Sequence, residues 1–236
     1  MAITLKSVLL NLRSRLAFKT LVFGISLIIL KTSGFSIWSV ILFLVLSAAL
    51  YSRPIFQTFF YIYQFAILIS LILLLLPHFS GFYFWGATLG FSLLFYFLLE
   101  LKNLVFIDRL SPNYLIHFGL IYGVLLAFFL ENFEFFIFKS IILFFTIGIL
   151  LSGILKGKLI WGFLPALLIS EAAVFVSWLP LGFLQSANFV FVISWFLADT
   201  ITQYRQKILT IKTVFRSLLI SILLIGLIFL TSGWSF

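Results

Sequence analysis

The chain has 236 residues, of which 64% are hydrophobic and only 9% are charged, and its mean hydropathy is +1.30. A soluble domain carries about a quarter charged residues, so this chain lacks the polar surface that a water-soluble globule of its size needs. The net charge of +9 does not indicate nucleic-acid binding, because the cations flank apolar stretches. The chain contains no cysteine, which excludes disulfides, thiolate metal sites and cysteine nucleophiles.

The first 16 residues carry apolar side chains at helical spacing, with Lys6 and Arg13 on another side of the same helix. The apolar positions are Leu5, Val8, Leu9, Leu12 and Leu16. This pattern predicts a basic amphipathic helix at the membrane surface over residues 1–15, followed by one transmembrane helical domain over 16–236. A signal peptide with an apolar core at 21–30 is the competing interpretation. No small-x-small cleavage site follows that core, and another apolar run comes directly after it, so we favour an uncleaved first span.

Long apolar runs fill the rest of the chain. A helix needs about 20 apolar residues to cross the hydrocarbon core, and inside lipid the backbone must pair with itself, so such runs are helical. The runs at 66–69 and 71–76 lack the alternation of barrel strands. The predicted fold class is all-α, a polytopic transmembrane helical bundle. We expect nine spans, at residues 16–30, 35–51, 54–76, 82–101, 113–130, 135–155, 159–180, 183–203 and 213–231.

The positions of Lys and Arg predict the orientation of these spans. If the N-terminus is cytoplasmic, thirteen Lys and Arg residues fall inside, whereas Lys31 and Lys139 fall outside. Positive residues accumulate on the cytoplasmic side of membrane proteins, so we expect the N-terminus inside and the C-terminus outside. Lys19 lies within the short first span, and we expect it to snorkel toward the headgroups. The inside residues are Lys6, Arg13, Arg15, Lys19, Arg53, Lys102, Arg109, Lys156, Lys158, Arg205, Lys207, Lys212 and Arg216.

Glu171 is the clearest polar residue at membrane depth, near the middle of the seventh span. Small residues four apart on that span, at Gly162, Ala166 and Ser170, predict a close approach of a neighbouring helix. We expect Glu171 to point into the bundle near that contact. A proton, cation or substrate site is one interpretation of it, because intramembrane carboxyls are costly. A structural hydrogen bond or ion pair is the other, and it is favoured.

Gln64 and Lys139 are two further polar residues inside predicted spans. Gln64 lies near the centre of the third span, where an amide usually bonds to another helix, so packing is favoured over ligand binding. Lys139 lies five residues into the sixth span. We expect it to snorkel outward toward Glu131 and Glu134, which would account for it without a functional role.

A second group of polar residues lies at the predicted cytoplasmic ends of spans four, five and eight. These acids, amides and cations fit a headgroup or phosphate site, because arginine binds phosphate in a bidentate manner. Ordinary charge pairs at the membrane interface are the alternative, and that alternative is favoured. The group comprises Glu100, Lys102, Asn103, Asp108, Arg109, His117, Asp199, Gln203 and Arg205.

Motifs that would indicate a known chemistry are missing. The sequence has no HExxH and no GxSxG, and residues 153–158 lack the length and the Ser or Thr of a phosphate-binding loop. Clustered aspartates that would hold magnesium are absent as well. GxxxG motifs at Gly86–Gly90 and Gly119–Gly123 indicate close helix packing. The sequence therefore predicts no catalytic residue, cofactor or metal.

The stretch EAAVFVSWLPLGF from Glu171 to Phe183, which leads into a span that ends at Asp199, resembles a pattern in uncharacterised multi-pass membrane proteins of reduced-genome bacteria. The resemblance covers about 30 residues. It implies a bacterial membrane protein and carries no established activity.

Three functions remain open on this sequence. The favoured one is a non-catalytic, multi-pass subunit or accessory of a membrane assembly in the cell (plasma or inner) membrane. Its partners would be anionic headgroups at the cytoplasmic face and other membrane subunits, with no nucleic acid. A small permease that uses Glu171 is the first alternative. The second is a lipid-modifying enzyme at the cytoplasmic face, which would require Asp108, His117 and Asp199 to converge.

Overall fold

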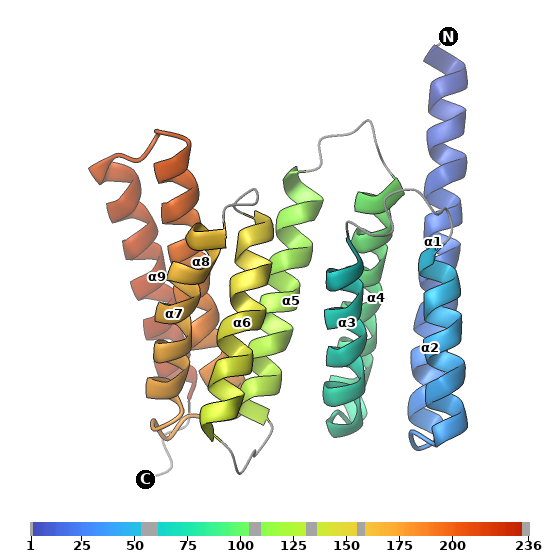
Figure 1. Cartoon of the computed structure of the whole chain (residues 1–236), viewed down its shortest axis with the longest axis horizontal. Helices are drawn as coiled ribbons and strands as arrows, with labels where there is room; N and C mark the ends of the chain where they lie inside the picture. Colours follow the sequence, from blue (N-terminus) through green and yellow to red (C-terminus); the bar gives the residue numbers. More distant parts are fainter. Residues whose placement is uncertain (1, 53–60, 104–109, 131–135, 155–158, 233–236) are drawn as a thin grey trace. The chain divides into compact units, whose positions relative to one another are not determined.

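The computed structural model describes residues 2–52, 61–103, 110–130, 136–154 and 159–232, with the backbone alone described for 2–12 and 110–112. All regular elements in these ranges are helices, and no strand occurs in them, which confirms the all-α prediction (Figure 1). The elements in chain order are α1 (Ala2–Thr32), α2 (Ile37–Ser52), α3 (Ile62–Leu75), the short 3₁₀-helix η2 (Leu76–His78), α4 (Gly81–Asn103), α5 (Leu110–Leu130), α6 (Phe136–Ile154), α7 (Leu159–Val176), α8 (Phe183–Arg205) and α9 (Ile211–Thr231).

The helices form two compact units, Met1–Ile116 and His117–Phe236, which are described separately. The division passes through α5, most of which belongs to the second unit. Within each unit, helices that follow one another in the chain run in opposite directions (Figure 1), and α1 packs against α2, α3 against α4, α6 against α7, α7 against α8 and α8 against α9. The expectation of a single domain over residues 16–236 stays a prediction.

The first unit is built around α1, which packs against both α2 and α4. Its inward residues follow the helical repeat, and Phe23 is fully buried among them. The Phe23 ring stacks on Phe95 of α4 with a centroid separation of 4.0 Å and lies 5.7 Å from Phe43 of α2. The buried apolar stripe of α1 consists of Leu16, Phe23, Leu27 and Leu30.

The turn after α1 explains how the first hairpin reverses direction. Gly34 has a φ of +64°, a left-handed conformation that glycine adopts without steric cost. The Phe35 amide donates to the Leu30 carbonyl at 3.2 Å and the Gly34 amide donates to the Lys31 carbonyl at 3.1 Å. These two bonds form a Schellman motif, which satisfies carbonyls at the end of α1. The chain then enters α2 within a few residues.

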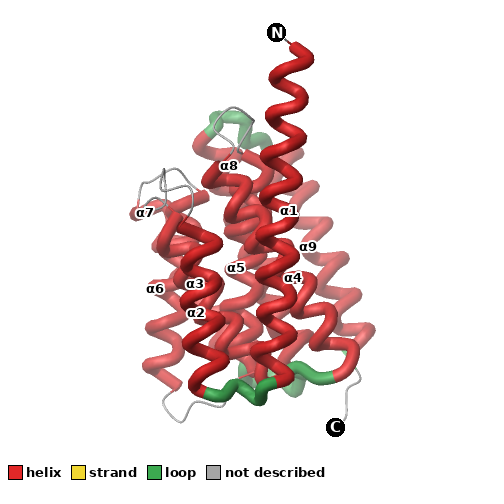
Figure 2. Tube along the Cα trace, turned by 90° about the vertical axis from the view of Figure 1, so that its right-hand side faces the viewer, coloured by secondary structure: helices red, strands yellow, loops and turns green. Residues whose placement is uncertain are grey.

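Residues 1–15 and the first predicted span are not separate elements. Helix α1 runs without interruption through both, and its first turns extend beyond the ends of α2 and α4 (Figure 2). A position of residues 1–15 on the membrane surface stays a prediction. Of the expected third span, 54–76, residues 54–60 lie outside the described residues, and in the described part α3 begins at Ile62.

The second unit has its closest helix contact between α6 and α7. A Cβ built on Gly162 of α7 would lie 2.5 Å from the Ser152 amide nitrogen and 2.6 Å from the Gly148 carbonyl oxygen of α6. The two backbones therefore meet at this point, and only glycine fits there. This confirms that the small residues of the seventh span face a neighbouring helix, with Ala166 and Ala173 fully buried on the same side.

The GxxxG motif of the fourth span does not pack in the same way. A Cβ on Gly86 or Gly90 would meet no atom within 4 Å among the residues that the structure describes. The prediction of close packing at this motif is therefore wrong for the described neighbours of α4. A small-residue motif permits a close approach but does not create one, because the partner helix must lie on that face.

Six of the described helices are long and apolar enough to cross a membrane. They are Gly81–Asn103, Asn113–Leu130, Phe136–Ile154, Leu159–Val176, Phe183–Arg205 and Ile211–Thr231. Helices α2 and α3 are apolar but shorter, at 16 and 14 residues. A helix rises about 1.5 Å per residue, so the described lengths of α2 and α3 correspond to about 24 Å and 21 Å of a hydrocarbon core of about 30 Å; η2 continues α3, and residues 53–60 between α2 and α3 lie outside the described residues.

Candidate functional site

Glu171 lies on the exposed side of α7, so the prediction that it points into the bundle is wrong. It follows Gly162 by nine residues, which is about two and a half turns of a helix with 3.6 residues per turn. Glu171 therefore faces away from the contact with α6 at Gly162. Its neighbour Ser170 is buried and donates its hydroxyl to the Ala166 carbonyl at 2.8 Å, so the inward position belongs to Ser170.

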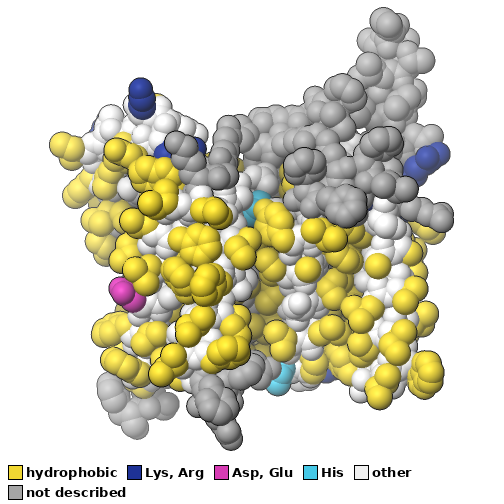
Figure 3. All heavy atoms as spheres, in the orientation of Figure 1, with side chains coloured by type: hydrophobic (Ala, Val, Ile, Leu, Met, Phe, Trp, Pro, Cys, Tyr) yellow, Lys and Arg dark blue, Asp and Glu magenta, His cyan; other side chains and the backbone are white. Residues whose placement is uncertain are grey.

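Apolar side chains surround Glu171 on this exposed side. We call the set the α7 outer face. Every member lies within about one fifth of a turn of Glu171 around the helix axis. Hydrophobic side chains cover most of the surface visible in Figure 3, and an acidic group stands out among them. The α7 outer face consists of Ile160, Leu164, Leu167, Leu168, Glu171 and Phe175, all exposed.

The position of Glu171 is costly if this face meets lipid. Insertion scales assign about 2.5–3.5 kcal/mol to a charged residue such as Asp at the centre of a spanning helix. Along α7, the residues that flank the carboxyl on the outer face are Leu167, Leu168 and Phe175, and none of them carries a side-chain hydrogen-bond donor. The carboxyl must therefore be protonated, reach water or meet a donor from outside α7.

Two lysines of the first unit bind the carbonyl end of α2. The ammonium of Lys19 donates to the Leu50 carbonyl at 3.0 Å, and that of Lys102 donates to the Tyr51 carbonyl. Lys102 is 2% exposed, and its ammonium lies 4.5 Å from the centre of the Tyr51 ring. The last carbonyls of a helix lack partners within the helix and carry partial negative charge, so both lysines stabilise this helix end.

The two lysines expected on the outer side of the membrane, Lys31 and Lys139, also have local partners. Lys31, near the end of α1, donates to the Pro77 carbonyl at 2.8 Å and thereby binds the carbonyl end of η2. Lys139 of α6 lies 4.4 Å from the centre of the Phe128 ring, which is a cation–π contact. The expected partners of Lys139, Glu131 and Glu134, lie outside the described residues.

The polar candidates of the first unit lie on two different helices. Gln64 of α3 is fully buried, and its amide nitrogen donates to the Tyr63 hydroxyl at 3.2 Å. Asn103, at the end of α4, donates to the Leu99 carbonyl at 2.7 Å. Glu100, one turn earlier, is half-buried. These bonds hold side chains against their own helices, as a structural role requires.

In the second unit, Asp199 and Gln203 form a hydrogen bond with each other on one helix. Asp199 accepts a hydrogen bond from the Gln203 amide at 2.7 Å and a second from the Ser217 hydroxyl of α9 at 2.8 Å. Ser217 is buried and was not among the sequence candidates. The group therefore ties α8 to α9.

A second bond between helices was also missed from the sequence. The Tyr122 hydroxyl of α5 donates to the Asn188 side chain of α8 at 2.8 Å. Tyr122 also meets the Phe191 ring at 5.2 Å in an edge-on arrangement. Neither residue belongs to a recognised sequence motif, and the two are 66 residues apart in the chain. Only the helix arrangement identifies the pair.

The remaining described candidates, His117 and Arg205, lie on two different helices. His117 of α5 is buried at 1% exposure. Arg205 borders a groove of about 540 Å³ with Trp161, Tyr204 and Lys207, at the end of α8. Asp108 and Arg109 lie outside the described residues. The convergence of Asp108, His117 and Asp199 stays a prediction.

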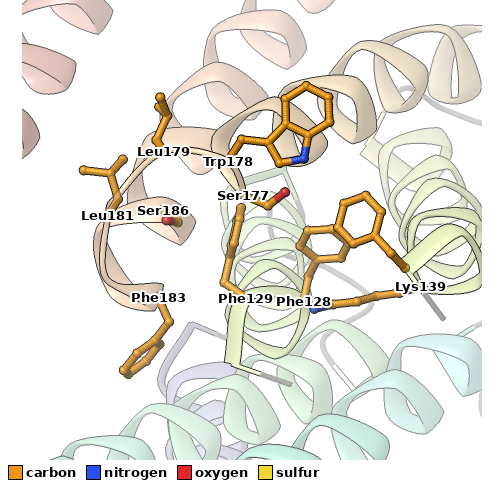
Figure 4. Close-up of a pocket in the computed structure, with 10 residues that line it drawn as sticks. Phe128, Phe129, Lys139, Ser177, Trp178, Leu179, Leu181, Phe183 and Ser186 are labelled. Atoms are coloured by element: carbon orange, nitrogen blue, oxygen red, sulfur yellow. The ribbon is translucent and has the colours of Figure 1, made fainter. Parts of the chain in front are cut away.

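A pocket of about 380 Å³ lies at the opposite end of the second unit (Figure 4). It is lined by aromatic side chains of α5, α6 and α8, with Lys139 and the buried Ser186 among them. Figure 4 shows the Lys139 side chain reaching toward the Phe128 ring. Its cation is thus engaged by the pocket wall. Glu171 lines neither this pocket nor the groove at Arg205.

No protein-family model, curated protein or solved structure matches the chain. Among the described residues, no group of three or more His, Asp or Glu side chains is placed to hold a metal ion. The function must therefore be inferred from the fold and the local contacts.

Proposed function

We propose that this chain is a non-catalytic, multi-pass subunit or accessory of a membrane assembly. The observation that carries the proposal is the position of Glu171 on the α7 outer face. A permease that moves a cation or proton needs its carboxyl inside the bundle, beside water. A carboxyl on an exposed apolar face is suited instead to contact with another membrane protein.

The chemistry of the other polar groups supports the same function. Lys19, Lys31 and Lys102 bind main-chain carbonyls, and Asp199 joins two helices through Ser217. These contacts stabilise helix ends and helix pairs. A role in holding the fold therefore accounts for each of them without a reaction.

We further propose nine crossings, with the N-terminus in the cytoplasm and the C-terminus outside, in the plasma or inner membrane of a bacterial cell. The helix directions within the second unit support this assignment. Arg205, Lys207 and Lys212 lie at the end where α8 stops and α9 starts, whereas Lys139 lies near the start of α6, at the other end. The groove at Arg205 offers two cations to anionic headgroups on the cytoplasmic side.

Reporter fusions test this topology. Alkaline phosphatase is active only outside the cytoplasm, whereas green fluorescent protein becomes fluorescent when it folds in the cytoplasm. We expect phosphatase activity and no fluorescence from fusions after Phe236. Fusions after Leu209, in the α8–α9 connection, serve as the control and should give the reverse. A fluorescent, phosphatase-negative tail would contradict an odd number of crossings.

A further inference from the structure

The α7 outer face is apolar, which suits contact with lipid, but it also contains a carboxyl group, which does not. Its side chains are apolar along more than four turns of the helix, yet its centre is a carboxyl group. On the helix, Glu171 lies about 20° or less from the mean direction of the exposed side chains, by the rotation of about 100° per residue. The carboxyl therefore lies at the centre of the α7 outer face, and any molecule that covers this face must contact it.

The depth of Glu171 keeps its carboxyl away from the headgroups. It lies five residues before the end of α7 and twelve after its start. These separations correspond to about 7.5 Å and about 18 Å along the axis. The two-carbon side chain of Glu is too short to snorkel over the greater distance, and along the shorter one the next exposed side chain of α7 is the apolar Phe175.

A comparison with α9 shows that an exposed apolar face does not by itself require a partner. The exposed side chains of α9 include Ile222, Leu223, Leu227 and Leu230, and no ionisable residue follows Arg216 on that helix. Lipid chains are sufficient to cover such a surface. The α7 outer face differs from it by a single carboxyl, and this difference calls for a hydrogen-bond donor or a positive charge at the same depth.

We propose that the α7 outer face is the docking surface for a membrane-spanning helix of another protein, which places a Lys or Arg against Glu171. The inference rests on the proposed function and names the chemistry of the partner. Opposite charges pair within membranes because each removes the cost of burying the other. The apolar side chains above and below Glu171 would supply the packing along the helix pair.

Eight cations among the residues that the structure describes are poorly placed for that role in a second copy. In the part of the second unit that the structure describes, Lys139, Arg205, Lys207, Lys212 and Arg216 lie within about two turns of a helix end. In the first unit, Lys19, Lys31 and Lys102 already bind main-chain carbonyls. A symmetric dimer through α7 would place one Glu171 against the other, which is repulsive unless a proton is shared. For this reason the partner is a different protein.

Binding of model helices tests the proposal directly. The full chain, labelled at a cysteine introduced by Ser177→Cys, is reconstituted in phosphatidylcholine vesicles with synthetic polyleucine helices that carry an acceptor fluorophore. The probes have Lys, Leu or Glu at their centre. We expect energy transfer with the Lys probe to exceed that with the Leu probe, and the Glu probe to give the least. Glu171→Leu should weaken binding of the Lys probe about threefold to twentyfold, the range of interactions between polar groups of neighbouring membrane helices.

Matched variants separate docking from damage to the fold. Glu171→Gln keeps the size and the hydrogen-bonding ability of the side chain and should retain only part of the preference for the Lys probe. Leu223→Ala on α9 removes a side chain of similar exposure from a face without a carboxyl, and it should leave probe binding unchanged. If Glu171→Leu does not fold, the Gln variant and the three probes on the unchanged chain still decide the matter.

Three results would overturn the inference. Equal binding of the Lys and Leu probes would mean that lipid covers the α7 outer face. Energy transfer between copies of the chain that disappears in Glu171→Leu would assign the face to a second copy. A photocrosslinking residue in place of Phe175 that forms a crosslink within its own chain would mean that the chain covers the α7 outer face itself. Failure of the proposed function would appear differently, as ion or proton uptake by vesicles that contain this chain alone.

Discussion

The close contact between α6 and α7 predicts that alanine substitutions at two glycines, Gly162 and Gly86, change the stability of the protein in opposite directions. Gly162 and Gly86 are both helical glycines of membrane-length helices. A Cβ at Gly162 would lie 2.5 Å from the Ser152 nitrogen, whereas a Cβ at Gly86 meets nothing within 4 Å. Gly162→Ala and Gly86→Ala therefore make the same chemical change in opposite surroundings.

The distances set the size and sign of the two effects. The atoms that the new methyl group would meet at Gly162 belong to the backbone of α6 and cannot rotate away. Ordinary contact begins near 3.4 Å, so the helices must separate by about 0.9 Å at this point. We expect Gly162→Ala to lower the free energy of unfolding by about 1–3 kcal/mol, as overpacking does. Gly86→Ala should raise it by about 0.5–1 kcal/mol, because Ala favours the helix.

Unfolding by sodium dodecyl sulfate in mixed micelles, followed by circular dichroism, measures both changes. The unchanged chain and the Gly86→Ala variant serve as references for expression and micelle content. An unchanged midpoint for Gly162→Ala would refute the close contact between α6 and α7. A loss of stability for Gly86→Ala as large as that for Gly162→Ala would refute the assignment of an open face to Gly86.

Three further substitutions follow from hydrogen bonds and are measured by the same unfolding assay. Tyr122→Phe removes the bond to Asn188 and should cost about 0.6 kcal/mol, with Tyr83→Phe on an exposed part of α4 as a control that changes nothing. Asp199→Leu removes the acceptor of two hydrogen bonds and should lower the free energy of unfolding by about 1–3 kcal/mol. Asp199→Asn keeps an acceptor oxygen and should lower it less. Equal losses for the two variants would contradict a role of these hydrogen bonds in stability. Lys19→Met removes the donor to the end of α2 and should cost about 1 kcal/mol, and an unchanged midpoint would mean that this helix end needs no cation.

The fold class could be predicted from the sequence because composition decides it. Runs of apolar residues near the length of a membrane crossing leave helix as the way to pair the backbone. The packing side of α7 was also visible, since Gly162, Ala166 and Ser170 repeat every four residues and all three are buried. The spacing of small residues along α7 is therefore sufficient to predict which side of this helix packs against its neighbour.

The direction of Glu171 was available from the same periodicity and was predicted wrongly. Glu171 follows Ser170 directly, and neighbours in sequence lie about 100° apart around a helix. The wrong prediction equated proximity along the chain with proximity in space. The angular position relative to Gly162 gives the outward direction without a structure.

The roles of the lysines could not be predicted in this way. Lys19 and Lys102 belong to α1 and α4, and their acceptors belong to α2, so the contacts depend on which helix end lies beside which side chain. The bond between Asp199 and Ser217 has the same origin in the pairing of α8 with α9. Such contacts arise from helix arrangement, which the apolar pattern of the separate spans does not encode.

The account depends on Glu171 lying on an apolar face and lining no water-filled path through the bundle. Because the chain contains no cysteine, a single introduced cysteine can measure water access at this position. Glu171→Cys and, as an exposed reference between α1 and α2, Ser36→Cys are each reconstituted in vesicles and treated with a water-soluble maleimide, which reacts with a thiolate only where water reaches it. We predict that the cysteine at position 36 is labelled and that the cysteine at position 171 remains unlabelled until the protein is unfolded with detergent. Labelling of both cysteines at the same rate would show that water reaches position 171 and would contradict the account.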